Sequence, residues 1–299
     1  MHGNTTKSFT KKRKVPTRCN YSIAILLATY NGERYLKDQI DSLLAQTFSD
    51  WHLYVHDDGS SDSTVRILEQ YKNEHPEKIT LFDYPSEGSA CKNFLSLLDR
   101  VDADYYMFCD QDDIWLPEKI DISLREMKVM EQESPGIGIV VCTDLFVVDE
   151  HLKVIAPSMW DYLSIHPQYI KTFRDSGGSA IATGCTMLFN HKAKTDCIPC
   201  TSSVMMHDCW VVLCTLKQHG KLHGIAKQLV KYRQHGDNSL GVGVSSSQIN
   251  LLYRIQHFLK LYKYNVAYYR MLSALHYGSV FKYLSAKIKY RQRIKRGYY

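Results

Sequence analysis

No hydrophobic run in the sequence reaches the roughly 18 apolar residues that a membrane-spanning helix needs. The basic N terminus also lacks the apolar stretch of a signal peptide. The sequence therefore argues against a spanning helix and predicts a protein made and kept in the cytoplasm. With 299 residues, 44% hydrophobic and 23% charged, the composition is typical of one large or two modest globular domains.

A glycine-rich phosphate loop is also missing. The sequence contains neither a Walker A loop nor a Gly-x-Gly-x-x-Gly loop after a strand. A diphosphate bound by this chain would therefore have to be neutralised by a metal ion, because no glycine cradle is available. The tails apart, the sequence shows no internal repeat and no low-complexity tract.

The cysteine pattern lacks the pairs of a disulfide framework or a closed zinc site. The nine cysteines are an odd number, and several lie inside apolar runs, which favours reduced thiols. Cys197-Ile-Pro-Cys200 has redox spacing, and His207 and Cys209 follow, but no second Cys-x-x-Cys pair completes a tetrahedral zinc site. Zinc or redox chemistry is thus the disfavoured interpretation.

Both ends of the chain lack acidic residues. Residues 1–20 carry six basic residues and residues 251–299 carry eleven, against a net charge of +6 for the whole chain. The middle of the chain is therefore acidic. This asymmetry argues against a general nucleic-acid binder and predicts ends that touch something anionic.

Three carboxylates crowd the end of one apolar run. The run 105–109 is typical of a short buried strand, and Asp110, Asp112 and Asp113 follow it within four positions. Like charges this close destabilise a fold unless a cation joins them, and Asp-x-Asp suits Mg²⁺ or Mn²⁺ that also binds phosphate oxygens. The alternative is an acidic loop in which Asp113 caps a helix that begins near Pro117.

Strand-like and helix-like runs alternate through the first half of the sequence. Strands are expected at 22–28, 51–56, 79–82 and 105–109, and helices at 35–46, from 65 onward, and around 93–98. This alternation predicts a parallel sheet that binds ligands at the carboxyl ends of its strands. After residue 135 the pattern is less regular, with strands expected at 137–144, 186–190 and 225–232, a helix at 207–218, and a long loop at 150–180.

A second acidic cluster follows the expected strand 51–56. Residues 57–64 read Asp-Asp-Gly-Ser-Ser-Asp-Ser-Thr, and a carboxylate there can accept hydrogen bonds from a base and a ribose. Alternatively, Asp62 or Ser61 caps the next helix. Two acidic strand ends beside Thr29-Tyr30-Asn31 can together hold a nucleoside and a metal-bound diphosphate.

These motifs together resemble those of the family 2 glycosyltransferases of the GT-A fold. The motifs are Ala28-Thr29-Tyr30-Asn31-Gly32, His56-Asp57-Asp58-Gly59-Ser60-Ser61-Asp62 and Cys109-Asp110-Gln111-Asp112-Asp113. Three later motifs resemble the bacterial rhamnosyltransferase-like subset, and they start at Thr183, His207 and Tyr232. The resemblance implies an α/β fold with a Rossmann-like, mainly parallel sheet flanked by helices.

The resemblance covers about residues 20–240 and divides the chain into three parts. We expect a basic disordered tail (1–20), a glycosyltransferase domain (21–240) with a nucleotide-binding half (21–115) and an acceptor half (116–240), and a basic aromatic helical extension (245–299).

The resemblance also implies a role for each matching residue. The nucleotide-sugar site would comprise Thr29, Tyr30, Asn31, Glu33, Asp57, Asp58 and Asp110. The metal, Mg²⁺ or Mn²⁺, would be held by Asp110, Asp112 and His235. Asp208 would be the catalytic base, with Gly184, His207 and Trp210 on the acceptor side. His207-Asp208 replaces the Glu-Asp pair usual in the family, which leaves open whether His207 helps orient the acceptor.

The implied activity is an inverting transfer of a sugar, with rhamnose from dTDP (or a UDP-linked sugar) as candidate donor, onto a lipid-linked saccharide. Such an enzyme would serve bacterial O-antigen or capsule synthesis on the inner face of the cell membrane, without binding nucleic acid. One base and a stabilised leaving group suffice for this displacement. The alternatives are a nucleotidyltransferase, which would want a glycine-rich basic loop that residues 29–33 do not offer, and a non-catalytic sugar- or membrane-binding protein with a degenerate site.

The C-terminal extension contains ten of the 21 tyrosines and no acid. Leu252, Ile255, Leu259 and Tyr262 fall on one helical face, with basic residues around it. Basic amphipathic helices of this kind lie on anionic membranes. The alternative is a set of helices packed on the catalytic domain, with their charges solvated.

Overall fold

The computed structural model describes residues 23–178, 182–236 and 251–296, without the side chains of 251–258 and 260. The predicted basic tail 1–20 lies outside the described residues. The strands are β1 (Ile23–Thr29), β2 (Trp51–Asp57), β3 (Ile79–Phe82), β4 (Tyr105–Cys109), β5 (Ile114–Trp115), β6 (Ile139–Val148), β7 (Val154–Ala156), β8 (Met187–Asn190) and β9 (Lys221–Arg233). The α-helices are α1 (Leu36–Leu44), α2 (Thr64–Glu74), α3 (Ala90–Arg100), α4 (Lys119–Glu133), α5 (Met159–Leu163), α6 (His191–Cys197), α7 (His207–Lys217), α8 (Leu251–Ala274) and α9 (Val280–Lys295).

The described strands form one sheet in the order β3-β2-β1-β4-β8-β6-β9-β5, with β7 paired to β6. The first four strands are parallel, as the alternation of strands and helices predicts. The second half is mixed, because β8 runs antiparallel to both of its neighbours while β6 and β9 run parallel to each other. In the parallel half, the carboxyl ends of β1, β2 and β4 therefore open onto one edge, where the predicted polar motifs lie.

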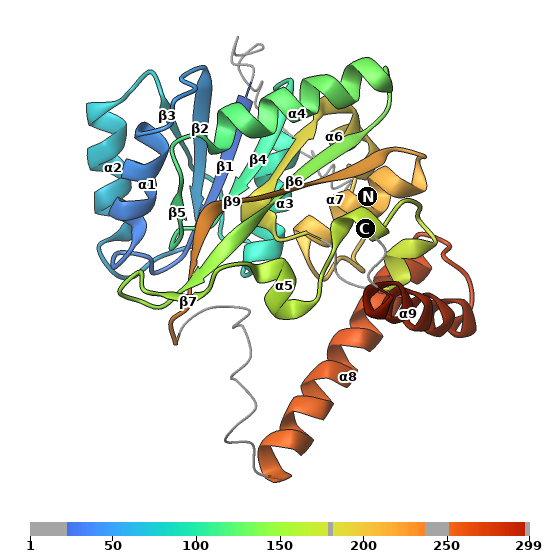
Figure 1. Cartoon of the computed structure of the whole chain (residues 1–299). Coiled ribbons are helices and arrows are strands. Elements are labelled where there is room, and N and C mark those ends of the chain that lie inside the picture. The colour runs from blue at the N-terminus through green and yellow to red at the C-terminus, as the bar shows by residue number, and fades with distance from the viewer. Residues whose placement is uncertain (1–22, 179–181, 237–250, 297–299) are drawn as a thin grey trace, which may run out of the picture.

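Helices cover both faces of the sheet (Figure 1). Along β1, Ile25 and Leu27 pack with α1, α2 and α4, whereas Ala24 and Leu26 pack with α3, α6 and α7. This alternation follows from the two-residue period of a strand, which sends successive side chains to opposite faces. Burial on both faces explains why the β1 sequence is a nearly continuous apolar run.

The described part of the predicted loop 150–180, residues 150–178, is not the patternless segment that the sequence suggests. It contains β7, α5 and two short 3₁₀ helices, and it is contacted by the C-terminal helices. The Tyr268 hydroxyl donates to the Ser176 carbonyl at 2.9 Å, and the His166 backbone N–H donates to the Tyr290 hydroxyl at 2.7 Å. A side chain at Gly178 would collide with Tyr290, since a Cβ there would lie 2.6 Å from that residue. The segment is therefore ordered by partners about 100 residues away.

The C-terminal helices are partly packed and partly exposed. Figure 1 shows α8 projecting from the body of the molecule, with α9 crossing near its packed end. Tyr268, Met271 and Leu272 of α8 are buried in the same apolar cluster as α3 and α7. In the predicted apolar face, Leu259 and Tyr262 are 49% and 60% exposed, while the side chains of Leu252 and Ile255 lie outside the description. No helix in the described part of the chain has both the length and the apolar character to cross a membrane.

Candidate active site

Thr29 and Asp57 are hydrogen-bonded to each other at the ends of β1 and β2. Their parallel register places them side by side, and the Thr29 hydroxyl donates to Asp57 Oδ2 at 2.8 Å. The other Asp57 oxygen accepts the backbone N–H groups of Gly59 and Ser60 at 3.1 and 2.7 Å. Thr29 is only 1% exposed. These two residues of the predicted nucleotide site therefore shape the loop around it.

Asn31 and Glu33 bind the loop that starts α2. Asn31 Oδ1 accepts the Ser61 backbone N–H at 2.8 Å, and Glu33 Oε2 accepts that of Ser63 at 2.8 Å. Asp62 Oδ1 accepts the Thr64 N–H at 2.9 Å, but Ser63 is the N-cap of α2, so neither Asp62 nor Ser61 caps the helix as the alternative had it. Asn31 adopts a left-handed conformation (φ 46°), which asparagine tolerates better than most residues. This part of the motif positions the β1 and β2 loops against each other.

Asp58 and Tyr30 lie in the loops that follow β2 and β1. Asp58 Oδ1 accepts the Ser86 hydroxyl at 2.8 Å and the backbone N–H groups of Glu87 and Gly88 at 2.5 and 3.2 Å. Tyr30 is 58% exposed, and its backbone is bridged by the Gln111 side chain. The structure thus joins the ends of β1, β2 and β4 and the loop before α3 into one continuous edge.

The acidic cluster at the end of β4 is electrostatically crowded. Burial raises the pKa of Asp110 well above its ordinary value, and the neighbouring carboxyls of Asp112 and Asp208 raise it further. Asp112 Oδ2 lies 2.8 Å from His235 Nε2, although the two residues are 123 positions apart. The structure therefore brings together the strand-end carboxylates, the predicted catalytic base and the C-terminal histidine.

Arg233 is a residue for which the sequence analysis predicts no role. Its guanidinium donates to the Asp112 carbonyl at 2.9 Å and to Asp38 Oδ2 at 3.0 Å, and it lies over the Tyr35 ring at 4.4 Å. Its backbone N–H also donates to Asp113 Oδ1 at 3.2 Å. These contacts fix the end of β9 against the β4 loop, so that His235, two residues later, reaches Asp112. The only sequence signal is its place in the motif that begins at Tyr232.

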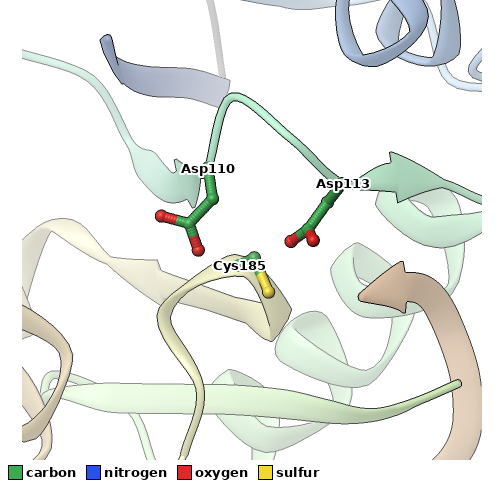
Figure 2. Close-up of side chains that lie close together, drawn as sticks. All are labelled: Asp110, Asp113 and Cys185. Atoms are coloured by element: carbon green, nitrogen blue, oxygen red, sulfur yellow. The ribbon is translucent and has the colours of Figure 1, made fainter. Parts of the chain in front are cut away.

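Asp113 does not cap a helix, which corrects that alternative. Helix α4 begins at Lys119 with Glu118 as its N-cap, and Asp113 is fully buried. Figure 2 shows the Asp113 carboxylate directed toward Cys185, with Asp110 on the other side of the loop. The Cys185 thiol hydrogen-bonds to Asp113. Burial lowers the pKa of the nearby Lys119, and the neighbouring Cys185 and Asp113 partly oppose that change. Asp113 thus belongs to a polar layer beneath the site.

The donor set at this edge fits a hard divalent ion. Asp110 and Asp112 offer carboxylate oxygens, and His235, 2.8 Å from Asp112, offers an imidazole nitrogen, which suit Mn²⁺ or Mg²⁺. Among the described residues, however, the ligand atoms that lie within 4.8 Å of one another belong to Asp110, Asp113 and Cys185. Cys185 lies near Asp110 and Asp113, but a thiol is a soft ligand that suits Mg²⁺ or Mn²⁺ less well than carboxylate oxygens do.

The predicted base Asp208 sits in the first turn of α7 with its carboxylate oriented by backbone. Its Oδ2 accepts the Gly184 N–H at 3.1 Å and its Oδ1 accepts the Cys209 N–H at 2.6 Å. A Cβ at Gly184 would lie 2.8 Å from His207 Nε2, so glycine is required for close packing there. The backbone N–H of Gly184 thus contacts the predicted base directly.

The other two residues predicted on the acceptor side point into the core. The Trp210 indole is 2% exposed and donates to the Cys197 carbonyl at 2.9 Å. The His207 ring is stacked on Phe94, with centroids 4.1 Å apart, and meets Phe108 edge-on at 4.5 Å. Both side chains are therefore packed in the core and do not contribute to an acceptor surface.

The buried His207 makes the fold acid-sensitive. Burial lowers the pKa of His207 below 6.5, and the nearby Asp208 opposes that change without cancelling it. As the pH falls through 6.5, the unfolded chain therefore binds a proton that the folded chain does not, and stability falls by up to about 1.4 kcal/mol per pH unit. His207→Leu should lose less stability than the wild type between about pH 7 and pH 5 in urea titrations. Equal losses in the two proteins would contradict the assignment of a neutral buried imidazole.

Two solved structures resemble this chain in fold at low sequence identity. TarS 1–349 of S. aureus, solved with UDP-GlcNAc, aligns with a TM-score of 0.54 and 16% identity over 74% of this chain and 62% of that one. The mannosyltransferase PcManGT of Pyrobaculum calidifontis, solved with GDP-Man and Mn²⁺, aligns with a TM-score of 0.52 and 12% identity over 93% of this chain and 76% of that one. The expectation of a GT-A fold is confirmed.

Sequence comparison identifies the family. Residues 24–196 match the model of glycosyl transferase family 2, and the chain belongs to that family. The dTDP-rhamnosyl transferase RfbG of Shigella flexneri is 39% identical over 98 residues, which are 31% of this chain and 34% of that protein. The β-1,3-glucosyltransferase WfgD of Escherichia coli, which is named for UDP-Glc and α-D-GlcNAc-diphosphoundecaprenol, is 30% identical over 109 residues, 36% of this chain and 42% of that protein. The alignments thus span less than half the length of these two relatives.

Proposed function

We propose that this protein is an inverting, metal-dependent glycosyltransferase that transfers a sugar from a nucleoside-diphosphate donor to a hydroxyl of a lipid-linked saccharide. The observation that carries the proposal is the convergence of Asp110, Asp112 and Asp208 at one sheet edge, with His235 bonded to Asp112 at 2.8 Å. A base beside a metal-binding carboxylate pair is what a one-step displacement requires. Crowded carboxylates destabilise a fold, so their presence at this edge favours a catalytic site over a non-catalytic protein.

In the proposed reaction, the acceptor oxygen forms a bond to the anomeric carbon while the bond from that carbon to the diphosphate oxygen breaks. Asp208 takes the proton from the acceptor hydroxyl, and the leaving electron pair stays on the nucleoside diphosphate. The backbone N–H groups of Gly184 and Cys209 hold the Asp208 carboxylate in place for that transfer. A divalent ion held by Asp110, Asp112 and His235 would supply charge neutralisation at the diphosphate.

For the donor and acceptor we propose rhamnose from dTDP and a diphosphate-linked lipid saccharide of a bacterial surface polysaccharide. The support is the names of the two relatives, one a dTDP-rhamnosyl transferase and one named for a diphosphoundecaprenol acceptor. Calorimetry with dTDP-rhamnose, UDP-glucose, UDP-GlcNAc and GDP-mannose, each with and without Mg²⁺ or Mn²⁺, tests the donor. We expect metal-dependent binding that is tightest for dTDP-rhamnose, and tighter binding of a UDP or GDP sugar would contradict the donor assignment.

We further propose that α9 lies on an anionic membrane surface, where a lipid-linked acceptor would be found. Phe281, Leu284 and Ile288 follow helical spacing and are 80%, 48% and 58% exposed. Tyr283 and Tyr290 lie on the opposite face of α9 and are buried against the body. The helix therefore packs through one face and presents an apolar stripe on the other.

The surroundings of that stripe are basic. Helix α9 carries six basic residues and no acid, namely Lys282, Lys287, Lys289, Arg291, Arg293 and Lys295. Arg293 is engaged with Asp175 at 3.1 Å. Each basic residue close to an anionic leaflet contributes about 1 kcal/mol of attraction, and exposed apolar side chains add interfacial anchoring. The combination favours an anionic membrane over a neutral protein surface as the partner.

Ile288→Gln should weaken binding to anionic lipid vesicles roughly tenfold, because burial of an isoleucine contributes about 1.5–3 kcal/mol. Ile155→Gln is a matched control, since Ile155 is 53% exposed on β7, outside α9. Co-sedimentation with phosphatidylglycerol-containing vesicles at low salt measures the effect. Equal losses in both variants, or equal binding of the wild type to neutral and anionic vesicles, would contradict the membrane assignment.

A further inference from the structure

A groove of about 340 Å³ lies beside the candidate active site, between α3 and the segment that joins α6 to α7. Cys91, Leu95 and Arg100 line it from α3, and Ser202 and Val204 line it from the opposite segment. Its volume falls within the range of small-molecule sites in proteins. None of its lining residues is among the nucleotide, metal or catalytic residues discussed above.

The groove adjoins the donor side and the base at the same time. Glu87, on its wall, donates its backbone N–H to Asp58 Oδ1 at 2.5 Å. Cys91, four residues further along, accepts a hydrogen bond from the His207 backbone N–H, and the Asp208 carboxyl lies close enough to help raise the pKa of the Cys91 thiol, after burial as the main cause. A molecule in the groove would therefore lie next to both the nucleoside edge and the proposed base.

The lining mixes apolar and polar side chains, and its formal charges balance. It includes two acids and two bases, Glu87, Asp99, Lys92 and Arg100, together with the hydroxyl groups of Ser96, Thr201 and Ser202. Several of these groups are already fixed, since Ser96 donates to Glu87 Oε1 at 2.6 Å and Arg100 is stacked over the Tyr84 ring at 4.1 Å. A phosphate would favour net positive charge, whereas balanced charges together with apolar side chains such as Leu95 and Val204 suit a neutral sugar ring, which presents both hydroxyl groups and apolar C–H faces.

We infer that this groove is the acceptor subsite and that it takes an uncharged, hydroxyl-bearing sugar ring of the acceptor saccharide. The inference rests on the proposed glycosyltransferase function and adds to it the place and the chemical class of the acceptor. It replaces the acceptor surface expected from the sequence, because His207 and Trp210 are buried and no residue of α7 is among those that line the groove.

Val204→Trp tests the subsite by filling the groove from its rim. Val129→Trp is the matched control, because Val129 is 48% exposed on α4, outside the groove. Ligand-observed NMR with methyl α-L-rhamnoside and methyl β-D-glucoside, with glucose 1-phosphate as an anionic comparison, measures saccharide binding. Calorimetry with the nucleoside diphosphate and Mg²⁺ measures the donor site separately. Ser202→Trp, at an exposed position on the same rim, serves as a second filling variant should Val204→Trp fold poorly.

We expect the wild type and Val129→Trp to bind a neutral glycoside, and the groove-filling variants to bind it at least tenfold more weakly while the nucleoside diphosphate binds all of them equally. Unchanged glycoside binding in the groove-filling variants would overturn the subsite, as would absence of glycoside binding in the wild type or a preference for the sugar phosphate. Failure of the wild type to bind any nucleoside diphosphate would instead count against the proposed function. The two failures are therefore distinguishable.

Discussion

Asp112→Ala should abolish metal-dependent binding of the nucleotide sugar, with an affinity loss of at least about a hundredfold, because the diphosphate would then face an unneutralised acidic cluster. Asp112 is the residue at which the β4 loop and the C-terminal segment meet, through its contact with His235 at 2.8 Å. Its loss would remove one of the proposed carboxylate ligands and the contact with His235. Calorimetry with and without Mg²⁺ or Mn²⁺ separates the metal-dependent part of binding.

Asp104→Ala is the matched control for that substitution. Asp104 is an exposed acid at the opposite end of the same strand, immediately before β4. The control removes the same charge from the protein, so a general electrostatic effect would alter both variants alike. Unchanged Mg²⁺ or Mn²⁺ dependence in Asp112→Ala would show that the metal is held elsewhere or is not used.

Asp208→Asn should lower turnover by about 10²–10⁴-fold, because it removes the base that takes the acceptor proton. Donor affinity should stay within roughly twofold, since Asp208 contacts the acceptor in the proposed reaction and does not contact the diphosphate. Kinetics at saturating donor, together with donor binding by calorimetry, separate the two effects.

The substitution has a structural side effect that the experiment must measure. Both Asp208 oxygens accept backbone N–H groups, from Gly184 and Cys209, and an asparagine amide can accept only one of them. An unpaired buried N–H costs about 1–3 kcal/mol of stability, so the thermal midpoint should fall while the protein remains folded. A folded variant with near-normal turnover would place the base elsewhere.

The parallel half of the fold could be predicted because each of its strands and helices follows from a pattern in a short stretch of sequence. The apolar runs at β1, β2, β3 and β4 are short and bounded by turn residues, and each observed strand lies within one residue of the predicted one. Parallel pairing then places the strand ends at one edge, so the meeting of Thr29 with Asp57 follows from topology.

The remaining features depend on partners far away in the sequence. Asp113 looks like a helix cap by spacing, yet it is buried because Arg233 and Cys185 reach it from β9 and the segment before β8. Residues 150–178 show no regular pattern in the sequence, and their conformation depends on tyrosines of α8 and α9 that contact them. The burial of His207 and Trp210 likewise depends on how α7 packs against α3 and β4, which local sequence does not encode.

The most direct test of the central claim is to follow the released sugar by NMR while the wild-type protein consumes the donor with Mg²⁺ and water as acceptor. We predict metal-dependent release of nucleoside diphosphate, with the free sugar first seen in the anomeric configuration opposite to that of the donor, and loss of this signal in Asp208→Asn. Release of the sugar with its configuration retained, or release that is unchanged when Mg²⁺ is removed, would contradict an inverting, metal-dependent transfer.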